Sequence, residues 1–253
     1  MINETFSIGT TILHKLDPRL RVIAAILFSV IIAISSRLPS LCVAIIISLL
    51  LILLARLPIR LVALRLFGIN IFILFIWLLI PISMDGETLM KLGPFYITKE
   101  GIIYSIIITM KSNAIAMVLM ALIATMPVFT LGRAMRYIYV PSKIINLFLF
   151  TFRYIHAIHR EYIRLANAIK IRGFRPGNNI HTYKTYAYLL GMLLVKSHDR
   201  AERVYAAMLC RGFRGRFYDL SNFSFKKCDL FTAPFLFLIL VFIYILEWTK
   251  IIY

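Results

Sequence analysis

A four-residue string, Arg-Gly-Phe-Arg, occurs twice in the chain and is the pattern best suited to recognition chemistry. It occupies residues 172–175 and recurs at residues 211–214, 39 residues later. An arginine guanidinium is planar and weakly hydrated, and it binds a carboxylate through two parallel hydrogen bonds. Two like strings could therefore present like arginines to two acidic partner surfaces.

The same string is also typical of a helix end. Glycine after the last turn accepts the left-handed conformation, phenylalanine folds back onto that turn, and arginine complements the negative end of the helix dipole. Capping does not require the same four residues at both ends, since any lysine and any apolar residue would serve. The residues alone leave two interpretations open: capping only, or capping together with docking.

Other chemistry is poorly represented. The sequence lacks Gly-x-x-x-x-Gly-Lys-Ser/Thr, so we expect ATP to be bound and hydrolysed elsewhere. His156 and His159 share a helix face, but Arg153 and Arg160 lie beside them and disfavour a bound cation. No carboxylate pair or nucleophile–base set is visible. We therefore predict no catalytic residue, no metal ligand and no cofactor in this chain.

Periodic apolar residues predict the helices that position the two strings. Ile158, Tyr162 and Leu165 recur at helical spacing before the first string. Glu161 falls on the opposite, polar face of that helix, which we expect to meet solvent. Residues 201–209 repeat the apolar pattern before the second string. Each string should therefore end an amphipathic helix.

The composition of the whole chain is both strongly hydrophobic and strongly basic. Of its 253 residues, 61% are hydrophobic, and 29 Lys and Arg stand against 11 Asp and Glu. A mean hydropathy of +0.86 is too high for an ordinary soluble domain and excludes disorder. The remaining class is an all-α integral membrane protein.

Five apolar runs approach the roughly 20 residues that a helix needs to cross a bilayer. They are residues 20–36, 38–55, 66–82, 102–126 and 230–252, of which the first and third are short. Lys111 lies inside the fourth run, and either pairing with Glu247 or snorkelling to the outer interface would satisfy it. We expect about five transmembrane helices.

The distribution of positive charge fixes the orientation, because cytoplasmic loops collect Lys and Arg. With the N-terminus inside, 24 basic residues lie on the inner side and 4 on the outer side. The sequence thus predicts a membrane part with four helices (1–126), a cytoplasmic domain of amphipathic helices (127–229) and a C-terminal transmembrane helix (230–253).

At the two strings the sequence resembles a known family. Residues 199–213 resemble the second coupling-helix motif of CbiQ, the transmembrane T component of cobalt energy-coupling-factor (ECF) transporters, and residues 169–174 resemble the first. Residues 6–9 and 14–19 resemble the opening of that family, so the similarity covers essentially the whole chain. The family's usual Ala-Arg-Gly has another apolar residue in place of alanine at both positions.

The resemblance implies a non-catalytic coupling subunit in the inner (cytoplasmic) cell membrane that serves cobalt uptake for cobalamin biosynthesis. Its implied partners are membrane lipid, two ABC-type ATPases (CbiO-like) that hydrolyse ATP, and a substrate-capture membrane subunit (CbiM-like, with or without a CbiN-like one). Each string's arginine would seat in a groove of one ATPase. The implied ATPase-binding residues are Arg172, Arg211, Ile171, Gly173, Cys210 and Gly212.

Other functions remain open at this point. A T component of a nickel or vitamin transporter would use a related subunit. A membrane enzyme acting on anionic lipids would suit the net charge of +13 over residues 127–229, because basic segments attract anionic headgroups. Nucleic-acid binding ranks last, since the inner-side bias already accounts for most of the positive charge, and we expect no nucleic-acid partner.

Overall fold

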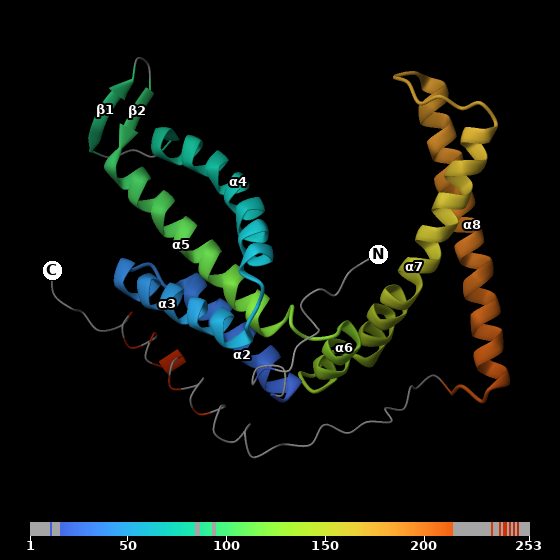
Figure 1. The fold of residues 1–253 in the computed structure, drawn as a ribbon, viewed down its shortest axis with the longest axis horizontal. Coiled ribbons are helices and arrows are strands. Elements are labelled where there is room, and N and C mark those ends of the chain that lie inside the picture. Colours follow the sequence, from blue (N-terminus) through green and yellow to red (C-terminus); the bar gives the residue numbers. More distant parts are fainter. Residues whose placement is uncertain are drawn as a thin grey trace. The chain divides into compact units, whose positions relative to one another are not determined.

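The structure is a computed structural model that describes two compact units of the chain (Figure 1). We call residues 2–139 together with 223–253 the membrane unit, and residues 140–222 the paired-helix unit. The described residues are 11, 16–83, 87–92 and 95–214, and near the C-terminus 234, 238, 240, 241, 243, 245 and 247.

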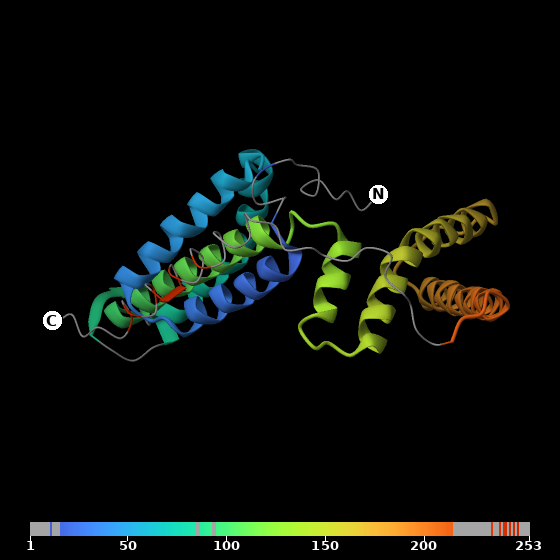
Figure 2. The same ribbon diagram turned by 90° about the horizontal axis from the view of Figure 1, so that it is seen from below.

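Five helices form most of the described part of the membrane unit. They are α2 (Pro18–Ile34), α3 (Leu38–Ala55), α4 (Ile59–Ser83), α5 (Lys99–Leu122) and α6 (Val128–Arg136). Helix α5 packs against α2, α3 and α4, and Figure 2 shows it lying alongside α2 and α3. It is therefore the central helix of this unit.

Small and apolar side chains fill the contacts around α5. The fully buried members of this core include Ala25, Phe28, Ile32, Leu41, Ala114, Val118, Ala121 and Leu122. The alanines among them let helix backbones approach closely, as is usual where helices associate within a membrane. The core of the membrane unit thus lies between α2, α3 and α5.

In the part of the chain that the structure describes, three helices are long and apolar enough to cross a membrane, namely α3, α4 and α5. Helix α2 has 17 residues and buries Arg21, so it is a shorter candidate. The predicted fifth crossing, residues 230–252, lies largely outside the described residues. The all-α membrane class is confirmed, and the number of five crossings stays a prediction.

Helix α4 is longer than its apolar run indicates. The run at residues 66–82 is only part of a helix of 25 residues that begins at Ile59. Arg60 and Arg65 lie in its first turns and are exposed. Because long arginine side chains reach toward water while their backbone stays helical, a search for uncharged runs leaves out this end of the helix. The short third run therefore belongs to a helix that is long enough to cross a membrane.

A hairpin that the sequence analysis did not predict joins α4 to α5. Strand β1 (Thr88–Leu92) pairs antiparallel with β2 (Phe95–Thr98). The Thr98 hydroxyl accepts a hydrogen bond from the Gly101 N–H and donates one to the Pro81 carbonyl, both 3.3 Å long. A Cβ at Gly101 would lie 2.7 Å from the Pro81 Cα, so only glycine permits this approach of α5 to the end of α4.

Polar side chains also join α4 to α5 within the apolar spans. Asn70 and Asn113 exchange two side-chain hydrogen bonds of 3.1 Å. Further along the same two helices, the indole N–H of Trp77 donates to the Thr109 hydroxyl at 2.9 Å. Polar groups within membrane spans find partners on neighbouring helices in this way.

Lys111 and Glu247 both bind near the turn between α2 and α3. The Lys111 ammonium donates to the Ala33 carbonyl at 2.8 Å, at the end of α2 where carbonyls lack intrahelical partners. The Glu247 carboxylate accepts hydrogen bonds from the hydroxyls of Ser35 (2.6 Å) and Ser40 (2.8 Å). No ion pair joins the two charges within the described residues, so the possible pairing was wrong: each charge has closer polar partners.

The paired-helix unit consists of two long helices, α7 (Ser142–Ile171) and α8 (Ile180–Cys210). Residues 172–179, which include Pro176 and Gly177, connect them. Few of their side chains are buried. Those that are buried are Ile145, Ala157 and Glu161 of α7, and Thr182 and Leu189 of α8. Most apolar side chains of these helices are therefore at least partly exposed.

Helix α6 belongs to the membrane unit. It packs on α2, where Ala134 is buried together with Val22 and Met126. The predicted cytoplasmic region 127–229 includes α6, whereas the contacts divide the chain between Tyr139 and Val140. The three functional domains inferred from the sequence stay a prediction.

Candidate functional site

The first Arg-Gly-Phe-Arg string forms the C-terminal cap of α7, with Arg172 as the cap residue. The Gly173 N–H donates to the Lys170 carbonyl at 3.0 Å, and the Phe174 N–H donates to the Ile169 carbonyl at 3.3 Å. This pair of hydrogen bonds is the Schellman motif, which satisfies carbonyls that the end of a helix leaves open.

The second string forms the same structure at the end of α8, with Arg211 as the cap residue. The Gly212 N–H donates to the Leu209 carbonyl at 2.9 Å, and the Phe213 N–H donates to the Met208 carbonyl at 3.1 Å. The capping interpretation from the sequence is confirmed, and the two caps have the same hydrogen-bond pattern.

Backbone conformation explains the glycine in each string. Gly173 has a φ of +82° and Gly212 a φ of +77°. A Cβ added at either position would meet no heavy atom within 4 Å, so space does not select glycine there. The left-handed conformation does, because it strains a residue that carries a Cβ.

The residues that the resemblance assigned to partner binding gather at these two ends, which we call the arginine tips. All six are exposed: Ile171, Arg172, Gly173, Cys210, Arg211 and Gly212. Ile171 is 86% exposed, although it is apolar. Among the described residues, no carboxylate forms an ion pair with either tip guanidinium. Both tips are accessible to another molecule.

The tip of α7 is supported by the first turns of α8. The ring of Phe174 lies 5.8 Å from that of Tyr186 in an edge-to-face arrangement, and 6.1 Å from the His181 ring. A hollow of about 560 Å³ lies beside these rings and is bordered by Arg172 and Lys196. The α7 tip is therefore held by aromatic contacts as well as by its cap.

One buried carboxylate lies between the two helices. Glu161 of α7 is 8% exposed and contacts three cations. Its oxygens lie 2.6 Å from Lys196 Nζ and 3.8 Å from an Arg200 nitrogen, both on α8, and 3.2 Å from an Arg164 nitrogen on α7. We call these four residues the ionic cluster. The hydrogen bond from Lys196, with the charges of Arg164 and Arg200, lowers the pKa of Glu161 although burial opposes this.

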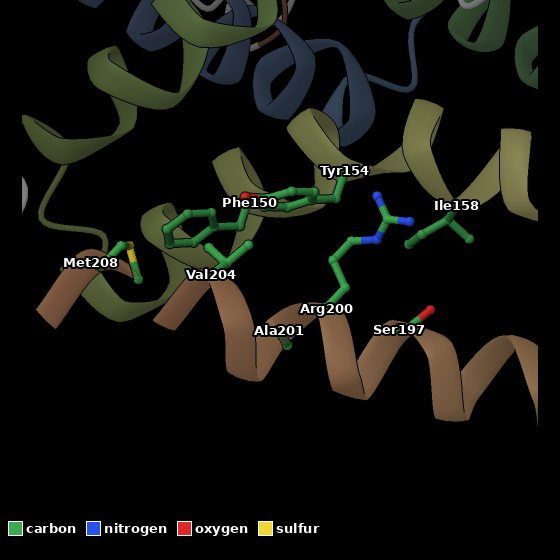
Figure 3. Close-up of a pocket in the computed structure, with 8 residues that line it drawn as sticks. All are labelled: Phe150, Tyr154, Ile158, Ser197, Arg200, Ala201, Val204 and Met208. Atoms are coloured by element: carbon green, nitrogen blue, oxygen red, sulfur yellow. The ribbon is translucent and has the colours of Figure 1, made fainter. Parts of the chain in front are cut away.

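The ionic cluster was missed by the sequence analysis, which placed Glu161 on a solvent-exposed face. Helical periodicity ranks faces by hydrophobicity, and a buried carboxylate surrounded by cations counts as polar in such a ranking. Figure 3 shows Arg200 extending from α8 toward α7, beside Tyr154 and Ile158. These residues border a second hollow, of about 270 Å³. The face that binds α7 to α8 is thus partly ionic.

Within the described residues, no three His, Cys, Asp or Glu side chains gather where a metal ion could bind. The ring of His156 lies edge-to-face with Phe152, and that of His159 stacks on Tyr162, with centroids 6.5 and 6.4 Å apart. Both rings contact aromatic residues of their own helix. The described site can bind another molecule through its exposed guanidinium groups and helix ends.

Fold and site together define an all-α integral membrane protein that displays two like arginine tips on helices separate from its apolar spans. Comparison with known proteins gives the family. The family described as "Cobalt transport protein" (CbiQ) matches residues 9–219. The chain belongs to the CbiQ family and is a CbiQ/EcfT-like T component, as the two strings indicated.

Individual relatives agree with this assignment. The chain is 30% identical to the energy-coupling factor transporter transmembrane protein EcfT of Heliobacterium modesticaldum, over 80% of each chain. It is 25% identical to the EcfT protein of Bacillus subtilis over 85% of each chain. It is also 25% identical to that of Acidaminococcus fermentans, over 95% of this chain and 94% of the relative. The similarity therefore extends through both units.

Proposed function

We propose that this protein is the coupling and scaffold subunit of an ATP-driven ECF-type importer of cobalt ions. In this proposal the two arginine tips each bind one ABC-type ATPase (CbiO-like), and the subunit also contacts a separate substrate-capture membrane subunit (CbiM-like). The names of the relatives, which are transporter transmembrane proteins, support it. The chain itself contributes no ATP-binding loop, so the partners hydrolyse ATP.

The observation that carries the proposal is the presence of two identical caps, each with an exposed arginine. A pair of like tips on one chain fits a pair of like partners. Helices α7 and α8 have 30 and 31 residues, which corresponds to about 45 Å each at 1.5 Å per residue. Rigid helices of this length can carry a displacement from an ATPase, because a packed helix moves as a unit.

The chemistry of the tips favours acidic grooves on the ATPases. A guanidinium binds a carboxylate bidentately and loses less hydration than an ammonium does on burial at an interface. The exposed apolar residue before each arginine, Ile171 and Cys210, would enter the same groove. Affinity would then come from an apolar contact and an ion pair at each tip.

The orientation follows from the charge distribution. On the five-crossing prediction, 24 basic residues lie on one side of the spans and 4 on the other. This bias supports an N-terminus and a paired-helix unit that face the cytoplasm across the inner cell membrane. That is the side on which ATP is available to the two ATPases.

Cobalt is the proposed cargo because the family that matches the chain is described as a cobalt transport protein. Related T components for nickel or vitamins are the alternative. The cargo is decided by the substrate-capture partner, so the test is to purify the intact complex and identify the ion bound to that partner. Nickel or a vitamin in place of cobalt would change the cargo and leave the coupling role intact.

The coupling role is tested by reversing the charge of both tips. We expect the double variant Arg172→Glu, Arg211→Glu to lose ATPase co-purification and Co²⁺ uptake by at least about tenfold, since a buried ion pair that loses one partner costs about 3–5 kcal/mol. The matched control is Arg153→Glu with Arg160→Glu, two exposed arginines of α7 that lie outside residues 169–174 and 199–213. Retained ATPases and normal uptake in the tip variant would refute the proposal.

A further inference from the structure

Apolar packing alone does not fix how α7 and α8 cross. The buried apolar side chains of the two helices are Ile145, Ala157 and Leu189. Hydrophobic stabilisation grows with the apolar area removed from water, and three such residues supply little for helices of this length. The aromatic contacts of Phe174 with α8 lie at the α7 tip, so they leave the crossing itself to be defined by another interaction.

The ionic cluster occupies the crossing itself. Along α7, residues that border the smaller hollow (150–158) come first, then Glu161, then residues that border the larger hollow (165–169). Along α8, Lys196 borders the larger hollow and Arg200 borders the smaller one. The helices therefore leave space on both sides of the cluster and meet at it.

The cluster also lies at equal sequence distances from the two tips. Glu161 precedes the end of α7 at Ile171 by ten residues, and Arg200 precedes the end of α8 at Cys210 by the same number. At 1.5 Å per residue each tip lies about 15 Å along its helix from the cluster. Glu161 and Arg200 are also 39 residues apart, the same offset as the two strings.

We propose that Glu161 is a positioning residue that sets the spacing of the two arginine tips, through its contacts with Lys196 and Arg200 across the helix crossing. The inference rests on the proposed function, since the spacing matters only if two partners are engaged at once. A carboxylate held by cations of the facing helix fixes both the distance and the rotation of that contact. Each tip then keeps a defined place relative to the other.

The experiment measures tip spacing in the intact complex with its ATPases, reconstituted in proteoliposomes. Nitroxide labels at Asn167→Cys and Ala206→Cys, both exposed and 39 residues apart, report the distance between the tip ends of the helices by double electron–electron resonance. The background replaces the native cysteines by Cys42→Ser, Cys210→Ala and Cys228→Ser. ATP hydrolysed per Co²⁺ imported is measured on the same samples.

We expect Glu161→Gln and Lys196→Glu each to broaden the distance distribution roughly twofold and to raise the ATP used per Co²⁺ several-fold, because the remaining cluster charges lose their partner. The swap of Glu161→Lys with Lys196→Glu should restore both values. The control Glu202→Gln alters an exposed acid of α8 that pairs with His198 at 3.4 Å, and it should change neither value.

An unchanged distribution and ratio in both single variants would overturn the inference, as would a swap that restores neither. If a single variant fails to assemble, the tip distance and the ATP used per Co²⁺ in the swap variant still test the role of Glu161. An unmodified chain that copurifies no ATPase would instead refute the proposed function, whereas bound ATPases with unaltered tip spacing would refute only the role of Glu161.

Discussion

The membrane unit and the paired-helix unit are stabilised in different ways. Around α5, side chains such as Phe28 and Leu122 are fully buried. On α8, by contrast, Tyr188 and Leu194 are 74% and 70% exposed. The core between α2, α3 and α5 is therefore defined by its own packing, whereas the geometry of the paired-helix unit depends on two caps, the aromatic contacts of Phe174 and one ionic cluster. The second unit leaves its apolar surface available for other molecules.

The contrast in packing predicts very different responses to truncation. We expect Phe28→Ala in the membrane unit to lower the free energy of unfolding by about 3–5 kcal/mol, because it leaves a cavity in a closed core. Leu194→Ala in the paired-helix unit should change it by less than about 0.5 kcal/mol. Thermal unfolding of both variants in detergent measures the difference. Equal losses would show that the two units are packed alike.

The dependence of the paired-helix unit on its caps can be tested at the tip glycines. Gly173→Ala or Gly212→Ala should destabilise its helix end by about 1–2 kcal/mol, because alanine is strained at a positive φ. We expect weaker ATPase co-purification as a result. Gly191→Ala, within α8 and with open space around its Cβ, should stabilise the helix by about 0.5–1 kcal/mol. A tip variant that behaves like this control would contradict the cap geometry.

The hydrogen-bonded pair of Asn70 and Asn113 in the membrane unit should contribute less to the free energy of unfolding. Asn113→Leu removes one partner of the pair with Asn70. We expect it to lower the free energy of unfolding by about 0.6 kcal/mol, and about 1.7 kcal/mol is the upper range for such contacts. Unfolding in mixed micelles measures it. The double variant Asn70→Leu, Asn113→Leu should recover part of the loss, since no polar group is then left without its partner. Failure to recover would mean that the two amides act independently.

Acidification should affect the paired-helix unit through Glu161. The folded-state pKa of this carboxyl is lowered below the ordinary 4.5, mainly by the hydrogen bond from Lys196 and by Arg164 and Arg200. Its contribution to stability is therefore fully present above about pH 4.5 and is lost as the pH falls through the lower, folded-state pKa.

Amide hydrogen exchange in α7 and α8, measured on the complex from neutral pH downward, should show weaker protection only below that range. Glu161→Gln removes the titrating group and should remove this part of the pH dependence. A loss of protection that begins near neutral pH and persists in Glu161→Gln would have another origin.

Local features of the fold could be predicted from the sequence, and long-range ones could not. Asp17 accepts the Arg19 N–H at 2.9 Å and Pro18 begins α2, as an N-cap followed by proline predicts. Both tip caps were also predictable, because a Schellman motif depends on residues within one turn. Such signals require only neighbours along the chain.

Features that depend on distant residues were the ones missed. Glu161 is buried because α8 supplies Lys196 and Arg200, some 35 and 39 residues away. Lys111 binds the end of α2 because three-dimensional packing brings that carbonyl within reach. Helical periodicity describes each helix separately, so it cannot report which polar residue faces another helix.

The sparse interior of the paired-helix unit bears on the fate of surplus copies in the cell. A chain synthesised in excess of its partners would display the apolar side chains of α8 to chaperones and proteases, which recognise such surfaces. Abundance of the subunit would then follow the supply of the other components, so degradation of orphan copies would keep the stoichiometry of the assembly without a dedicated regulator.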